Sequence, residues 1–325
     1  MNIAFAGFRH PHIFELYKLA LTEKIISITG CFEEDISAKK AAENLGISFR
    51  YDTYSQLLED DDVQIVAIGD YYGIRGQRVI EALEHGKHVI CDKPLCISLE
   101  ELDKIETLAK ENNLKICIML DLRYLPQTEK VKAIISSGEL GKINIATFTG
   151  QHCLDYGNRP AWYFEYGKHG GTINDIAIHG IDLIRYITGK NLSSVEFAKT
   201  WNAFAKEEPD FKDCAQFIIN MDGMTVNADV SYAAPKFNGF MPTYWNFTFW
   251  GEEGMLNFKF CDNEIHIYKN KEEVITMPDR KIDYLNDFIK EIKGEDPIYI
   301  DAIDMLDSQR QVLEIQKTSE IQKGR

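Results

Sequence analysis

The sequence predicts an α/β protein in which a doubly wound parallel sheet is followed by an α+β domain with a large, mainly antiparallel open sheet. Over roughly the first 120 residues, short apolar runs alternate with helical stretches of about ten residues, the pattern of a parallel sheet with right-handed crossovers. After residue 124 the apolar segments lengthen and alternate with polar residues. A chain of 325 residues favours two domains, which we place at 1–122 and 123–325.

The strands of the first domain are compact apolar runs, and its helices end at recognisable signals. The run at 63–68 is almost entirely apolar, as a buried parallel strand is, and Gly46 stands at a C-cap position after the second helix. The predicted strands are residues 3–6, 25–32, 63–68, 88–91 and 115–120. The predicted helices are residues 11–20, 35–45, 76–84 and 99–112.

Longer alternating segments separated by turn signals define the second domain. Asp222-Gly223 and Glu253-Gly254 are two such signals, and they favour hairpins between neighbouring strands. The predicted strands are residues 143–152, 195–204, 214–221, 225–232, 244–250 and 255–260. The predicted helices are residues 128–136, 172–188, 284–293 and 302–318.

Composition excludes several classes of partner. Lys and Arg number 36 against 51 Asp and Glu, and the resulting net charge of −15 repels nucleic-acid phosphates and anionic lipid. No apolar stretch approaches the ~20 residues of a membrane helix, and the N-terminus lacks a signal-peptide pattern, so we expect a cytoplasmic protein. Seven cysteines without a CxxC pair predict reduced, mostly buried thiols rather than disulfides or a zinc site.

The turn after the first strand lies where a dinucleotide-binding Rossmann domain places the cofactor pyrophosphate. Backbone N–H groups and the positive end of a helix favour an anion there. The glycine-rich fingerprint requires glycine at 7, 9 and 12, and only Gly7 matches; Arg9 and His12 fill the other positions. We expect Gly7, Phe8, Arg9 and His10 to contact the cofactor, with Arg9 as the cation for phosphate. The alternative is a turn that has lost its nucleotide.

Acidic and polar residues follow the second and third strands. Glu33 stands where an acidic side chain hydrogen-bonds the ribose hydroxyls and repels a 2′-phosphate, which favours NAD over NADP. Residues 70–75 follow the third strand, and there we select Asp70, Tyr72 and Arg75 as further cofactor contacts.

The most specific segment is Asp92-Lys93-Pro94, at the carboxyl end of the fourth strand. A lysine fixed between an apolar strand and a rigid proline can lose water and exchange a proton with a substrate hydroxyl. The Lys93–Pro94 bond is a candidate for the cis form. We place Asp92 and Pro94 beside the cofactor. The alternative is a surface lysine in a turn.

In residues 170–182, two glycines lead into a helix that carries Asp175 and His179 four residues apart, on one face. Asp175 can accept a substrate hydroxyl or orient Lys93, and His179 can exchange a proton near neutral pH. Such a pair also suits a metal ion or a helix-surface hydrogen bond. A third ligand is not evident, so we expect no metal.

Together these segments resemble the Gfo/Idh/MocA family of dehydrogenases, which includes glucose–fructose oxidoreductase and inositol dehydrogenase. The match is carried by residues 86–89 and 92–95, Arg123-Tyr124, Trp162, Gly170-Gly171, Asp175, His179 and Asp182. The resemblance implies that Lys93, Asp175 and His179 form the catalytic group. It also implies NAD(P), a sugar, polyol or related carbonyl substrate, and an open sheet that builds homodimers or homotetramers.

The sequence therefore predicts an NAD-dependent oxidoreductase that moves a hydride between nicotinamide and a secondary alcohol or ketone of a sugar-like molecule. Candidate substrate contacts are Arg123, Tyr124, His152 and Trp162; for Trp162, core packing is an equal alternative. One alternative function is a glycosidase that oxidises its substrate transiently and restores a bound NAD. The other is a non-enzymatic nucleotide- or sugar-binding protein, since the glycine-rich turn is degraded.

Overall fold

The computed structural model describes residues 1–279, 282–297 and 299–321, which form two compact units. The first unit contains residues 1–119 together with 165–170 and 283–307, and the second contains the other described residues. The sequence placed every residue after 122 in the second domain. In the structure, residues 165–170 and 283–307 belong instead to the first unit.

The first unit is built on a five-stranded parallel sheet with strand order β2-β1-β3-β4-β5. Its strands are β1 (Asn2–Ala6), β2 (Ser27–Phe32), β3 (Ile65–Ile68), β4 (His88–Cys91) and β5 (Ile116–Ile118). Its helices are α1 (His12–Thr22), α2 (Ile36–Glu43), α3 (Tyr54–Leu58), α4 (Tyr72–Glu84), α5 (Leu99–Glu111) and α8 (Tyr284–Lys293). The strand order reverses beside β1, and in such sheets ligands bind outside the carboxyl ends of the strands at that point.

Two helices of the first unit differ from the prediction. Helix α4 begins at Tyr72, four residues early, because Tyr72 and Arg75 are fully buried and the helix is held by tertiary packing. A side chain at Gly76 would meet the Glu101 carboxylate at 2.5 Å, so this glycine lets α4 approach α5. The short helix α3 was not predicted; a capping box of Thr53 and Gln56 begins it.

The second unit is built on an eight-stranded sheet with strand order β13-β12-β11-β10-β6-β9-β8-β7. Its strands are β6 (Ile143–Cys153), β7 (Leu192–Trp201), β8 (Cys214–Met221), β9 (Met224–Ala234), β10 (Asn246–Gly251), β11 (Met255–Lys259), β12 (Glu264–Tyr268) and β13 (Glu272–Thr276). Strands β6 and β9 are parallel and the other neighbours are antiparallel, which confirms the mainly antiparallel sheet.

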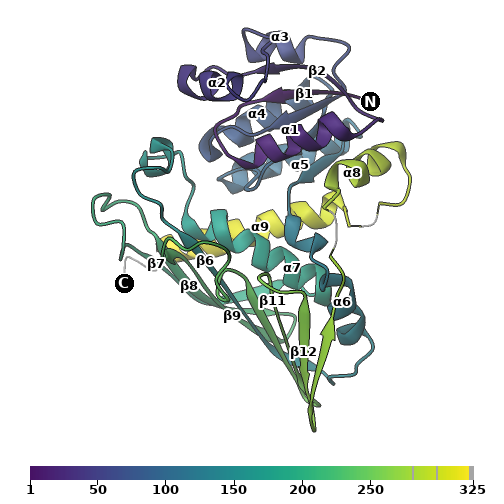
Figure 1. Cartoon of the computed structure of the whole chain (residues 1–325), viewed down its shortest axis with the longest axis vertical. Helices are drawn as coiled ribbons and strands as arrows, with labels where there is room; N and C mark the ends of the chain where they lie inside the picture. The colour runs from purple at the N-terminus through teal and green to yellow at the C-terminus, as the bar shows by residue number, and fades with distance from the viewer. Residues whose placement is uncertain (280–281, 298, 322–325) are drawn as a thin grey trace. The chain divides into compact units, whose positions relative to one another are not determined.

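Helices cover one face of this sheet. The helical segments of this unit are η1 (Asp121–Tyr124), α6 (Thr128–Ser136), η2 (Ala161–Phe164), the π-helical turn η3 (Ile173–Ala177), α7 (Ile178–Thr188) and the later part of α9 (Ala302–Ile321). Helices α6 and α7 lie along the same face (Figure 1). A side chain at Gly180 would meet the Phe148 ring at 2.2 Å, so the glycine lets α7 lie directly on β6. Among the described residues, no helix is both long and apolar enough to cross a membrane.

Candidate functional site

The turn between β1 and α1 is packed tightly against the end of β3. Gly7 has φ +81°, and a side chain there would meet the Asp70 backbone at 2.7 Å, so only glycine fits. The main-chain N–H groups of this turn donate within the protein: Phe8 to Glu33 Oε2 at 2.5 Å, and Arg9 and His10 to the Gly69 carbonyl. A phosphate at this turn would therefore depend on side chains more than on these main-chain donors.

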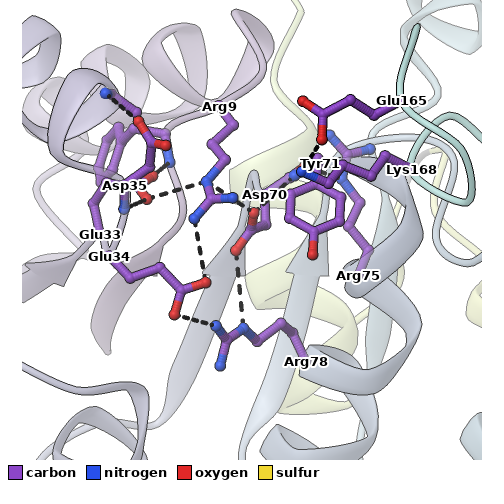
Figure 2. A network of polar contacts seen from close by, with 12 residues as sticks. Arg9, Glu33, Glu34, Asp35, Asp70, Tyr71, Arg75, Arg78, Glu165 and Lys168 are labelled. Carbon is purple, nitrogen blue, oxygen red and sulfur yellow. Dashed lines mark hydrogen bonds and ion pairs between the residues drawn. The ribbon is translucent and has the colours of Figure 1, made fainter. Parts of the chain in front are cut away.

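Charged side chains connect the carboxyl ends of β1, β2 and β3. The Arg9 guanidinium lies 3.2 Å from both Glu33 and Glu34 and 3.3 Å from Asp70, and Arg78 lies 3.2 Å from Glu34 (Figure 2). Burial raises the pKa of Asp70 to about 6. The guanidiniums of Arg9 and Arg78 are thus already neutralised by carboxylates. Neither has a free positive charge for an additional phosphate, such as the 2′-phosphate of NADP.

Glu33 does not present its carboxylate as the sequence suggests. Its side chain has no exposed area, and it accepts from Phe8, from the Arg9 side chain and from the Asp35 N–H. The next residue, Glu34, has a side chain that is 48% exposed. The geometry therefore favours Glu34 as the acceptor for ribose hydroxyls, with Glu33 as the group that holds the turn.

A buried cluster surrounds Asp92 at the end of β4. The His10 ring contacts one carboxylate oxygen of Asp92, His12 lies 2.9 Å from the other, and Arg75 approaches within 2.9 Å. Burial lowers the pKa of His10 to about 3, so its imidazole is neutral. Although burial opposes ionisation, His10 and Arg75 hold the pKa of Asp92 well below its usual range.

Three residues of this cluster, His10, His12 and Asp92, offer ligand atoms within 4.8 Å of one another, a spacing that could hold a metal ion. Arg75 counts against this role. Its guanidinium is fully buried and already neutralises the Asp92 carboxylate, so a divalent cation would face an uncompensated neighbouring charge. We interpret the cluster as a hydrogen-bonded network that fixes residues 92–94.

Arg75 shapes the segment that contains Lys93. It donates to the carbonyl oxygens of Asp92 at 3.0 Å, Lys93 at 2.6 Å and Pro94 at 3.2 Å, and the Lys93–Pro94 bond is cis, which confirms that prediction. Lys93 is only 4% exposed, and its ammonium lies 5.9 Å from the centre of the Tyr72 ring. The alternative of a surface lysine in a turn is therefore wrong.

Three predicted cofactor contacts have buried side chains. Phe8, Tyr72 and Arg75 are at most 3% exposed. The Phe8 ring packs in an aromatic cluster, 5.5 Å from Phe14, and Arg75 stacks 4.6 Å over Tyr72. The three side chains shape the turn and the Lys93 segment, and their contact with a cofactor stays a prediction.

In the second unit, Asp175 lies in the π-helical turn η3 and His179 in the first turn of α7. Asp175 is 3% exposed and accepts a hydrogen bond from the Tyr232 hydroxyl. His179 is 5% exposed, and its Nδ1 lies 3.2 Å from a carboxylate oxygen of Asp121. A hydrogen bond thus orients Asp175, and the Asp121 carboxylate gives the His179 ring a charged neighbour.

Tyr232 and Asp121 were not selected from the sequence. Tyr232 is the last residue of the predicted strand 225–232, and Asp121 precedes the family segment Arg123-Tyr124 by two residues. The sequence signals that could have identified them are the position of Tyr232 at a strand end and the position of Asp121 beside a family motif. Burial raises the pKa of Tyr244 to about 12, and the charges of Asp121 and Asp175 contribute, so both carboxylates act on the same phenol.

The predicted substrate contacts differ in how accessible they are. Arg123 is 1% exposed and is paired with Asp182 through bonds of 2.8 and 2.5 Å, which favours a structural role. Tyr124 is also buried, and Trp162 is 7% exposed and stacks on Tyr163 at 4.1 Å, as its core-packing alternative predicts. His152 is half-buried, and of the four candidates it presents the most accessible ring.

The two halves of the chain match the two domains of one known protein family. Residues 2–120 match an oxidoreductase family described as having an NAD-binding Rossmann fold, and residues 128–257 match the GFO/IDH/MocA C-terminal domain. The chain belongs to the Gfo/Idh/MocA family. The resemblance read from the sequence is thereby confirmed.

Characterised members of the Gfo/Idh/MocA family resemble the chain over part of its length. The scyllo-inositol 2-dehydrogenase (NAD(+)) of Bacillus subtilis is 34% identical over 202 residues, which cover 61% of this chain and 57% of that protein. The levoglucosan dehydrogenase of Pseudarthrobacter phenanthrenivorans is 29% identical over 169 residues, 50% of this chain and 43% of that protein. The chain spans about half the length of the curated relatives it matches.

Solved structures of Gfo/Idh/MocA oxidoreductases share the fold over the whole chain. A levoglucosan dehydrogenase in complex with NADH and levoglucosan has a TM-score of 0.81 at 19% identity, covering 99% of this chain and 97% of that chain. An aldose-aldose oxidoreductase from Caulobacter crescentus, complexed with glycerol, has a TM-score of 0.78 at 18% identity, covering 100% and 98%. At these identities the similarity establishes the fold.

The buried pair of Arg123 and Asp182 should stabilise the second unit of this family member. We expect Asp182→Asn to lower the free energy of unfolding by about 3 kcal/mol, because it leaves the buried Arg123 charge without its carboxylate. All four tryptophans lie in the second unit, so urea unfolding followed by tryptophan fluorescence reports on it. Asp210→Asn, at an exposed position, is the matched control. A loss below 1 kcal/mol (roughly the value of an exposed pair) would contradict the structural role.

Proposed function

We propose that the protein is an NAD-dependent oxidoreductase that transfers a hydride between nicotinamide and a secondary alcohol or ketone of a sugar or polyol. The observation that carries the proposal is Lys93, a lysine only 4% exposed, fixed by Arg75 and cis-Pro94 at the carboxyl end of β4. A lysine is rarely buried without a chemical or structural reason. The names of the relatives, dehydrogenases of inositol and levoglucosan, support the substrate class.

The residues of the first unit fit a dinucleotide. Gly7 allows the close approach of β1 and β3 at the turn, and the exposed Glu34 carboxylate follows the end of β2, where ribose hydroxyls bind in this fold. We propose NAD rather than NADP, because the surroundings of Glu34 carry two further carboxylates, Glu33 and Asp70, against two arginines. A bound nicotinamide supplies the hydride acceptor in oxidation and the hydride donor in reduction.

We propose that Lys93, Asp175 and His179 act on one substrate. In oxidation, Lys93 or His179 accepts the hydroxyl proton as the carbinol carbon loses hydride. Asp175, held by the Tyr232 hydroxyl, accepts a hydrogen bond from the substrate or orients the base. Such proton transfer contributes ~10²–10⁴-fold to the rate, and positioning of the reactants supplies most of the remainder.

A screen of sugars, inositols and keto-sugars, followed at the nicotinamide absorbance with NAD and with NADP, tests this proposal. We expect NADH to form with at least one polyol or sugar, and a higher kcat/KM with NAD than with NADP. Release of a sugar from a glycoside without a change in NADH would instead support the transient-oxidation glycosidase. Calorimetry that detects binding of neither NAD nor NADH would support the non-enzymatic alternative.

We also propose a cytoplasmic homodimer or homotetramer. The seven cysteines all lie among the described residues and are free thiols, as a reducing compartment maintains them. On the second unit's sheet, large apolar side chains are 37–42% exposed; these are Ile145, Phe197, Ile218 and Trp250. An apolar patch on an open sheet is typical of a subunit interface, and the mass in solution tests this.

A further inference from the structure

A cavity of about 370 Å³ opens in the second unit, lined in part by His152 and Tyr244. Its walls come from three segments: the end of β6 with the residues that follow it, the residues after β9, and the segment that leads into β10. Neither Asp175 nor His179 lines this cavity. The space is therefore additional to whatever room a substrate ring takes at those two groups.

Aromatic rings connect this cavity to His179. The ring of Phe240, which is 54% exposed, lies 4.8 Å from Tyr244, and Tyr244 lies 4.8 Å from His152. His152 in turn lies 5.6 Å from Trp245, which is 5.6 Å from the His179 ring. The cavity and the candidate proton acceptor thus border one continuous aromatic cluster, and a ligand at His179 lies close to the cavity.

Polar side chains border the aromatic wall. Asp155 is half-buried and lies 3.3 Å from the Lys236 ammonium. The Arg159 guanidinium is held by bonds to the carbonyl oxygens of Leu154 and Cys153 at 2.8 and 2.6 Å. Flat aromatic faces pack on the C–H surfaces of a sugar ring, and fixed polar groups bind its hydroxyls. The cavity combines both features.

We propose that this cavity is a binding site for a second sugar ring, so that the substrate is a two-ring glycoside rather than a monosaccharide. The inference rests on the proposed oxidoreductase function and deepens it. One ring is oxidised at the group that includes His179, and the second ring stacks against Phe240 and Tyr244. The cavity volume falls in the range of sites that enclose small organic ligands, about 300–1,000 Å³.

The test compares cellobiose, maltose and lactose with the methyl glycosides of their non-reducing sugars. For the wild-type protein we expect kcat/KM for one of the disaccharides to exceed that of its methyl glycoside at least tenfold. Phe240→Ala should bring this ratio close to one, and Phe240→Tyr, which keeps the aromatic face, should restore it. Phe204→Ala is the matched control, because Phe204 is also 54% exposed and does not line the cavity.

Calorimetry of the same disaccharides in the presence of NADH separates the two proposals. Binding that Phe240→Ala weakens, without any oxidation, would support the second-ring site and overturn the proposed redox function. Oxidation of disaccharide and methyl glycoside with equal kcat/KM would support the function and overturn the second-ring site. Equal losses in Phe240→Ala and Phe204→Ala would also overturn the site.

Discussion

Replacing Lys93 with alanine is expected to lower kcat roughly 10³-fold, within the 10²–10⁴-fold range of general acid–base catalysis. Lys93 is only 4% exposed and follows β4 at the ligand-binding edge of the parallel sheet, so its ammonium has little contact with bulk water. The dissociation constant for NADH should change little, because the turn at Gly7 and the charges around Arg9 remain. Steady-state kinetics and NADH fluorescence titration measure the two quantities.

Lys93→Arg distinguishes proton transfer from charge alone. Arginine keeps the positive charge but cannot give up a proton in a protein, so it should be as inactive as alanine if Lys93 exchanges a proton. Because the side chain is buried, urea unfolding must show that both variants remain folded. Near wild-type turnover by Lys93→Ala would remove Lys93 from the mechanism, and full activity of Lys93→Arg would reduce its role to electrostatics.

The sequence predicted best those elements whose periodicity and end signals agree. Helices α6 and α8 and strand β8 begin and end at the predicted residues. Strands β12 and β13 were missed because β12 is only five residues long and β13, at the sheet edge, is mostly exposed and begins with Glu272 and Glu273. These strands are defined by their pairing, β12 with β11 and β13 with β12, rather than by their own composition.

Candidate site residues could be selected from local segments, but their partners could not. Lys93 was identifiable because strand, lysine and proline are adjacent in the sequence. Tyr232 reaches Asp175 across 57 residues and Asp182 reaches Arg123 across 59, and such pairs arise only from sheet order and helix packing. For the same reason Arg123 was assigned to substrate binding, since its buried partner was not visible in the sequence.

We expect His179→Gln to lower kcat about 10²-fold and to remove the acidic limb of the pH–rate profile. Glutamine approximates the size of the imidazole and its hydrogen bonds but cannot accept a proton near neutral pH. His179 is 5% exposed and packs against Trp245, so the variant should keep the fold. Rates measured between pH 5 and 9 (roughly the range of histidine titration) test this. An unchanged acidic limb would assign it to another group.

Asp121→Asn tests whether Asp121 acts through His179. The carboxylate lies 3.2 Å from Nδ1, where its charge favours the protonated imidazole. Asparagine removes the charge, so the imidazole pKa should fall and the acidic limb should move to lower pH, with a plateau about tenfold lower. Asp121 has a 38% exposed side chain, which limits the shift through solvent screening. A plateau loss without any movement of the limb would show that Asp121 supports the fold and does not position His179.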